Sequence, residues 1–131
     1  MKYIYTAVFT PNKDSSKFYA QIPDLPGCVT TGKSLQDAIV QITDAASGWL
    51  VVAEDEGLTI PEPSFQSVIH KTDGDLLSLI QIDTIAYRAA TETKAVRKNV
   101  SLPQWMSVLA DKMGVNCSQL LQESLMKRFH A

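Results

Sequence analysis

The segment that most constrains this chain is a lone strand-like stretch near its C-terminal end. Residues 93–102 alternate as a β-strand does, with Val96, Val100 and Leu102 on one side and polar side chains on the other. Only helical spacing follows it. A lone strand cannot satisfy its own backbone donors and acceptors, and a segment of about 40 residues without metal or disulfide rarely folds alone. We therefore expect two copies of the chain to pair these strands antiparallel and to interlock the helices that follow.

Two short helices are predicted after this strand. Pro103 lies where the first turn of a helix tolerates proline, and Gly114 is a natural C-cap. Asn116 then caps a second helix. The apolar or small side chains of the two helices recur at helical spacing and are Trp105, Met106, Leu109, Met113, Leu120, Leu121, Ser124, Leu125 and Phe129. Residues 89–131 are therefore predicted to form a β-α-α module that dimerises.

The outward face of the predicted strand carries Arg97, Asn99 and Ser101, residue types that hydrogen-bond base edges in a major groove. Two-stranded ribbons enter that groove, and Lys94 is expected to contact phosphate. Free backbone N–H groups at the start of the second helix can also bind a phosphate. These groups belong to Asn116, Cys117, Ser118 and Gln119. Such a strand face is also an ordinary solvated surface, but its combination with basic residues and this turn favours DNA binding.

Two stretches of this module, R-K-N-V-S-L-P-Q-W-M from residue 97 and M-G-V-N-C-S-Q-L-L-Q-E-S-L from residue 113, resemble the ribbon-helix-helix family. The resemblance covers about the last third of the chain. It implies that the three outward strand residues contact bases. Lys98 departs from the pattern because the alternation places it on the inward side of the strand, among the apolar residues. Its ammonium group could reach water from there only at the end of the ribbon.

A sheet with one covering helix is predicted for the N-terminal part. Its strands are rich in aromatic and β-branched residues or are continuous apolar runs, and turn residues bound them. The predicted strands are residues 3–9, 17–22, 28–31 and 76–82. The order β-β-β-α-β indicates an α+β domain over residues 1–88, which precedes the β-α-α module of residues 89–131.

The helix of this N-terminal domain has clear end signals. Ser34 is an expected N-cap with Asp37 three residues further on, an acidic variant of the capping box. Gly57 suits the C-cap, and prolines soon after it forbid continuation. Between the caps, apolar residues recur at three- and four-residue spacing, which marks one buried face. Residues 84–93 are interpreted as a short connector with about one helical turn.

Charge is divided unevenly along the chain, whose net charge is −2. Residues 1–90 carry six Lys and Arg against eleven Asp and Glu, a net charge of −5. Residues 91–131 carry six against three, a net charge of +3. An acidic part followed by a basic part is consistent with two partners of opposite charge, one for each part.

The segment D-L-P-G-C-V-T-T-G-K-S-L-Q-D-A, residues 24–38, is similar to the signature of HicB antitoxins. As in that family, it follows two predicted strands and opens a helix. With the C-terminal module, the resemblance extends over nearly the whole chain. It implies a HicA-type toxin as partner, a small basic ribonuclease that cleaves messenger RNA. The N-terminal domain would cover the active site of the toxin, and the complex would repress its own operon.

Two short segments are candidate contacts for that partner. The first is the tight turn Pro26, Gly27 and Cys28, which also has an ordinary structural role. The second is the acidic helix end at Glu54, Asp55 and Glu56, where negative charge opposes the helix macrodipole. Its charge would attract a basic protein, although a solvated helix end accounts for the same pattern.

An enzyme is one alternative, because the β-β-β-α-β order resembles a trimmed ribonuclease H fold. Two-metal nucleases need several converging carboxylates. The first predicted strand contains neither Asp nor Glu, and Asp37 and Asp44 lie on the polar side of the helix. His70 and His130 have no partner at metal-binding spacing. We therefore expect no catalytic residues, no metal and no cofactor.

The remaining features place the chain among cytoplasmic proteins. Cys28 and Cys117 give neither a disulfide framework nor a four-ligand zinc site, which favours a reducing compartment. We expect no signal peptide, no membrane span and no membrane partner. The expected assembly is a homodimer through the C-terminal module, with higher oligomers left open. A free-standing ribbon-helix-helix regulator whose N-terminal domain senses a small molecule is a second interpretation.

Overall fold

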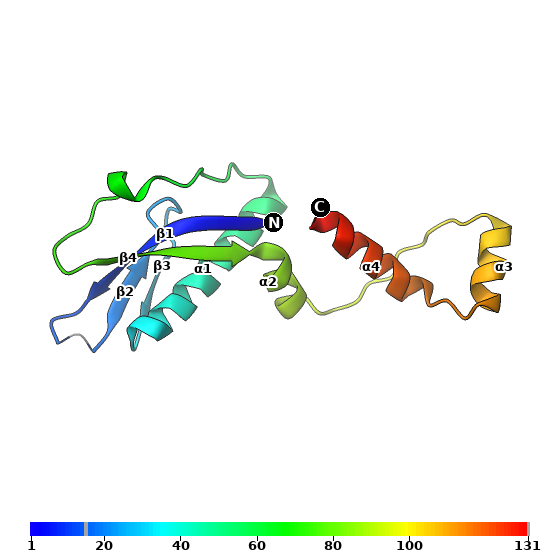
Figure 1. The fold of residues 1–131 in the computed structure, drawn as a ribbon, viewed down its shortest axis with the longest axis horizontal. Coiled ribbons are helices and arrows are strands. Elements are labelled where there is room, and N and C mark those ends of the chain that lie inside the picture. Colours follow the sequence, from blue (N-terminus) through cyan, green and yellow to red (C-terminus); the bar gives the residue numbers. More distant parts are fainter. Residues whose placement is uncertain (15, 131) are drawn as a thin grey trace. The chain divides into compact units, whose positions relative to one another are not determined.

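The computed structural model describes residues 1–14 and 16–130 (Figure 1). Two compact units divide the chain. The first comprises Lys2–Thr91, and the second begins at Glu92. The buried hydrophobic cluster lies entirely within the first unit. The first unit therefore encloses a core of its own.

Four antiparallel strands form the sheet of the first unit. They are β1 (Lys2–Pro11), β2 (Phe18–Gln21), β3 (Val29–Gly32) and β4 (Leu76–Asp83), in the order β3-β2-β1-β4. All four predicted strands are therefore confirmed, and the third begins one residue later than expected. β1 is the longest strand, and it pairs with β2 along one edge and with β4 along the other.

Helix α1 (Leu35–Glu56) covers one face of this sheet (Figure 1). Both predicted caps are confirmed. The hydroxyl of Ser34 accepts a hydrogen bond from the backbone N–H of Asp37 at 3.1 Å, and the Asp37 carboxylate accepts one from the N–H of Lys33 at 2.8 Å. This is a variant of the capping box, because the Asp37 carboxylate bonds the N–H of the residue before the N-cap rather than that of Ser34 itself. Gly57 ends the helix with a φ of 67°, which favours glycine.

The core lies between α1 and the covered face of the sheet. Alternate residues of β1, namely Tyr5, Ala7 and Phe9, point to this face and are almost completely buried. Ile42 and Leu50 meet them from α1. The side chains on the opposite face of β1 belong to a sheet surface that no helix of this unit covers.

The first turn of α1 passes very close to the end of β3. A Cβ atom built on Gly32 would overlap the backbone N and Cα atoms of Ala38. Ala38 is itself fully buried. Only a residue without a side chain allows this approach, so Gly32 of the G-K-S-L segment sets how closely the helix lies on the edge of the sheet.

The expected connector after β4 is a helix of eight residues, α2 (Thr84–Thr91). Asp83 caps it: one carboxylate oxygen accepts hydrogen bonds from the backbone N–H groups of Ile85 at 3.0 Å and Ala86 at 3.1 Å. These bonds, the one from Ala86 foremost, lower the pKa of the Asp83 carboxyl group. An aspartate directly before the segment was the sequence signal for this helix.

The second unit contains helices α3 (Gln104–Lys112) and α4 (Cys117–Phe129). The predicted N-cap of α4 is confirmed, because the side-chain oxygen of Asn116 accepts a hydrogen bond from the N–H of Gln119 at 3.0 Å. The C-cap of α3 is Met113 rather than the predicted Gly114, which follows it with a φ of 65°. Residues 92–103 form neither helix nor strand. The strand predicted over residues 93–102 is therefore absent from the single chain, which offers no strand to pair with it.

The second unit also has no core of its own. Among its described residues, all are exposed except Ala110, which is half-buried. Even the largest apolar side chains remain open to solvent, with exposed fractions of 61% for Trp105, 83% for Val96 and 53% for Phe129. The first unit is therefore a closed structure, whereas the second presents its apolar side chains outward.

Candidate functional site

The second unit contains an apolar groove of about 540 Å³ between its extended segment and its two helices. Most of the lining side chains are aliphatic or methionine. They include Val100, Leu102, Met106, Leu120 and Leu121. Full burial of a large apolar side chain is worth about 1.5–3 kcal/mol, so the open groove leaves several such contributions unrealised.

Side chains of the extended segment divide between this groove and solvent only in part as the sequence alternation predicts, because Val96, predicted on the inward side, lies outside the lining and is 83% exposed. Lys98, Val100 and Leu102 line the groove. Arg97, Asn99 and Ser101, which alternate with them, are exposed and lie outside its lining. Lys94, expected to contact phosphate, is exposed as well. The structure thus places the predicted base-contacting side chains together on one exposed stretch, and Lys98 among the apolar residues.

The start of α4 was the second expected nucleic-acid contact. Asn116, Cys117, Ser118 and Gln119 are all exposed there. The expectation needs one correction, because the backbone N–H of Gln119 already donates to the side-chain oxygen of Asn116. That N–H is therefore not free for a phosphate. Cys117 and Ser118 retain the expected place at the helix N-terminus, where the helix dipole favours an anion.

The turn at residues 26–28 serves the fold of the first unit. The N–H of Cys28 donates to the carbonyl of Leu25 at 3.0 Å, and its carbonyl accepts from the N–H of Ile22 at 3.1 Å. The Cys28 side chain is buried, which raises the pKa of its thiol, and so it is not a surface contact as expected. Pro26 and Gly27 remain exposed, and the Pro26 carbonyl accepts a hydrogen bond from the Trp49 indole at 2.9 Å.

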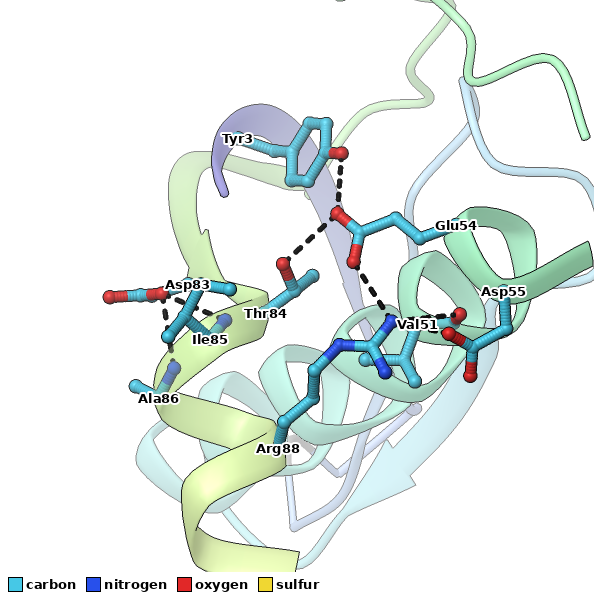
Figure 2. A network of polar contacts seen from close by, with 9 residues as sticks. All are labelled: Tyr3, Val51, Glu54, Asp55, Asp83, Thr84, Ile85, Ala86 and Arg88. Atoms are coloured by element: carbon cyan, nitrogen blue, oxygen red, sulfur yellow. Dashed lines mark hydrogen bonds and ion pairs between the residues drawn. The ribbon is translucent and has the colours of Figure 1, made fainter. Parts of the chain in front are cut away.

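The acidic end of α1 takes part in the polar network shown in Figure 2. One oxygen of the Glu54 carboxylate accepts hydrogen bonds from the hydroxyl groups of Tyr3 at 2.7 Å and Thr84 at 3.0 Å. The other oxygen lies 3.2 Å from Nη2 of Arg88. The Glu54 side chain is only 15% exposed. Glu54 therefore joins β1, α1 and α2 at one point.

Arg88 bridges two of the three residues predicted as an acidic contact surface. The same Nη2 atom that meets Glu54 lies 2.8 Å from the carboxylate of Asp55 (Figure 2). It also contacts the carbonyl of Val51 in the last turn of α1 at 3.5 Å. A cation at this position compensates the negative end of the helix dipole. The charges of Glu54 and Asp55 thus hold α2 against α1, and only Glu56 keeps the expected exposed position without an ion pair among the described contacts.

A second set of polar contacts fastens the loop between α1 and β4. The Asp24 carboxylate accepts hydrogen bonds from the Ser64 backbone N–H at 2.8 Å and from its hydroxyl at 2.6 Å. The hydroxyl of Tyr5 donates to the Pro61 carbonyl at 2.6 Å. Burial, and next the charge of Asp24, raise the pKa of Tyr5. No pattern in the sequence pointed to these pairs, because their members lie 40 and 56 residues apart.

Two negative findings apply to the part of the chain that the structure describes. No three or more His, Cys, Asp and Glu side chains gather there in a way that could hold a metal ion. Within the same residues, no helix is both long and apolar enough to cross a membrane.

Comparison with known proteins gives a family match over most of the chain. The model for HicB-like antitoxins of bacterial toxin–antitoxin systems matches residues 5–123. Among curated proteins, the UPF0150 protein Ta0767 of Thermoplasma acidophilum is 27% identical over 64 residues. That match covers 49% of this chain and 91% of the relative.

Solved structures with a similar fold cover nearly all of this chain. A toxin–antitoxin complex from Streptococcus pneumoniae matches with a TM-score of 0.58 at 19% identity, covering 98% of this chain and 99% of that one. The crystal structure of antitoxin HicB3 matches with a TM-score of 0.52 at 24% identity, covering 96% and 97%. The Burkholderia pseudomallei antitoxin HicB gives a TM-score of 0.51 at 20% identity, covering 95% and 96%. At these identities the likeness is one of fold.

The network in Figure 2 makes a testable contribution to stability at high pH. Burial, and next the hydrogen bond to Glu54, raise the pKa of Tyr3 from 10.0 to about 12. Because the folded state holds the phenol proton more tightly than the unfolded chain, this stabilisation is present below pH 10 and is lost as the pH rises towards 12. When the free energy of unfolding in urea is measured at a series of pH values from 10 to 12, it should fall less for Tyr3→Phe than for the wild type. Equal losses would show that the Tyr3 hydroxyl is solvated.

Proposed function

Because this chain belongs to the HicB-like antitoxin family of bacterial toxin–antitoxin systems, we propose that its first unit binds a HicA-type toxin and that a dimer of its second unit binds operator DNA. The complex would thereby repress its own operon. The observation that carries the proposal is the contrast between the two units: the first has a closed core, whereas the second exposes an apolar groove beside a basic extended segment.

A second copy of the chain is the partner that best fits the open groove. Antiparallel pairing of two copies of residues 93–102 would satisfy backbone groups that the single chain leaves without a strand partner. The same pairing would bring the inward side chains Val100 and Leu102 of both copies against their helices. Burial of large apolar side chains at about 1.5–3 kcal/mol each would offset the entropy lost on association. This is the arrangement of the ribbon-helix-helix fold that the sequence resembles.

DNA is the proposed ligand of the outer face of that ribbon. Arginine and asparagine can each make bidentate hydrogen bonds to a base edge, Arg97 to guanine and Asn99 to adenine, while serine is less selective. Lys94 and the start of α4 would contact phosphates. The net charge of +3 on residues 91–131 favours a polyanion.

The first unit is the proposed toxin-binding part. Its net charge of −5 would speed encounter with a basic ribonuclease, and contact with the active site of the toxin would then exclude RNA. Of the residues predicted for this contact, we retain Pro26, Gly27 and Glu56, which are exposed. Cys28, Glu54 and Asp55 are left out because the first is buried and the other two are bonded within the unit.

We propose no catalytic activity for the chain itself. β1 carries no acidic residue, which removes the central carboxylate that a ribonuclease H-like site would need. The carboxylates nearest to the sheet have structural partners. Asp83 caps α2, and Glu54 is held by Tyr3, Thr84 and Arg88.

Two substitutions distinguish base reading from phosphate contact. Asn99→Ala should weaken operator binding by about 1–3 kcal/mol and relax sequence preference, because a base contact is lost. Lys94→Ala should weaken binding to all sequences alike and reduce the salt dependence. Competition titrations with operator and random duplexes at several salt concentrations measure both effects. If Asn99→Ala weakened both duplexes equally, Asn99 would contact only the DNA backbone.

A truncated chain separates the two proposed activities. We choose a cut after Thr91, because α2 is bonded to α1 and the boundary expected at residue 88 would remove the last turn of this helix. Residues 1–91 should rescue cells that express the toxin gene beside this one, but should neither bind operator nor repress it. Growth rescue, co-purification and a promoter reporter measure the three properties, with the full chain as control. Operator binding at full affinity by residues 1–91 would contradict the proposal.

A further inference from the structure

Phe65 is exposed to an unusual degree for an aromatic side chain. It lies in the loop between α1 and β4, directly before the short 3₁₀ helix Gln66–Val68, and 84% of its surface is open to solvent. Val68, one turn later, is 71% exposed. Among the described residues these two form an apolar projection from a unit that otherwise buries its phenylalanines completely or in part, as Phe9 and Phe18 show.

The loop holds this projection in a fixed position. Asp24 accepts two hydrogen bonds from Ser64, the residue directly before Phe65. Tyr5 fastens Pro61, and Pro63 restricts the backbone between the two attachment points. On the other side, the Phe65 carbonyl accepts a hydrogen bond from the N–H of Val68 at 3.1 Å. A loop backbone fixed in this way loses little conformational entropy when a partner covers Phe65.

The surroundings of Phe65 are acidic. Glu62 is exposed three residues before it, and the carboxylate of Asp24 is bonded to Ser64 directly before it. An aromatic residue beside a carboxylate fits a partner surface with an apolar pocket and a basic rim. Aromatic side chains that fill such pockets carry a large share of the binding energy in protein interfaces.

We propose that Phe65, with Val68 and Glu62 beside it, is the anchor that inserts into an apolar, basic-rimmed pocket of the toxin, and that Asp24 is the positioning residue for this anchor. The proposal rests on the proposed toxin-binding function of the first unit. It also gives Asp24, which opens the D-L-P-G-C segment, a role beyond the turn itself.

A second copy of this chain fits the anchor less well. The first unit has an apolar groove of about 410 Å³ whose lining includes Gly27, Trp49, Val52 and Leu58. Val52 lies on the α1 face that also carries two acidic residues, Glu56 four positions after it and Asp44 eight positions before it. Insertion of Phe65 from another copy would bring Glu62 towards these carboxylates. Like charges therefore favour a basic partner over self-association.

The test compares two exposed aromatic residues in the full chain. The probe is the cognate HicA-type toxin, bound to immobilised wild-type, Phe65→Ala or Tyr19→Ala protein. Tyr19 is the matched control, because it is 56% exposed but lies on the sheet face that no helix of its unit covers. Phe65→Ala should weaken binding about 30-fold or more and Tyr19→Ala less than threefold, with unchanged thermal unfolding of both variants. Equal losses, or a larger loss for Tyr19→Ala, would overturn the anchor.

The role of Asp24 needs a double-mutant cycle. If Asp24 acts by holding Phe65, Asp24→Ala should weaken toxin binding, whereas Asp24→Ala in the Phe65→Ala background should add almost nothing. Additive losses would show an independent contact. A wild-type chain that does not bind the toxin would defeat the proposed function and this inference together, whereas binding that is indifferent to Phe65 would defeat the inference alone. Sedimentation showing that Phe65→Ala abolishes self-association would instead assign the anchor to a second copy.

Discussion

Backbone groups of residues 93–102 find no strand partner within the second unit, and the rest of the account depends on this constraint. The segment alternates as a strand does, and its inward side chains Val100 and Leu102 already line the groove with α3 and α4. Without a partner, the segment leaves its backbone N–H and C=O groups without strand partners and the apolar side chains of the groove exposed to solvent. A second copy would close both at once, because a two-fold axis brings the same edge and the same groove together. The proposed DNA binding would use the face that such a ribbon leaves outside.

In the first unit, by contrast, polar side chains from distant parts of the sequence are bonded to one another. Glu54 joins β1, α1 and α2, and Arg88 neutralises the acidic end of α1 (Figure 2). This network fixes the point at which the chain leaves the first unit for the second. Asp24 and Tyr5 play a similar part for the loop that carries Phe65. Two clusters of polar contacts therefore hold two parts of this unit in place. One holds α2, where the chain leaves the unit, and the other holds the loop that carries Phe65.

Local signals explain what could be predicted from the sequence. Ser34, Gly57 and Asn116 act through their nearest neighbours, so these helix ends were predictable, and strand-forming residues bounded by turn residues were sufficient for the four strands. The Glu54–Arg88 pair was not predictable, because its members are 34 residues apart and meet only after β4 has returned to the sheet. For the same reason, the acidic helix end was interpreted as a contact surface. Cys28 was misplaced because a tight turn does not reveal which of its side chains points inward.

Amide hydrogen exchange of residues 93–102 in the full chain, measured over a range of protein concentrations, tests the central claim most directly. The account predicts that amides in this segment are protected at high concentration, in the alternate pattern of a paired strand, and that protection falls on dilution as the dimer dissociates. Exchange at the rate of an unstructured peptide, at concentrations where sedimentation shows a dimer, would contradict it.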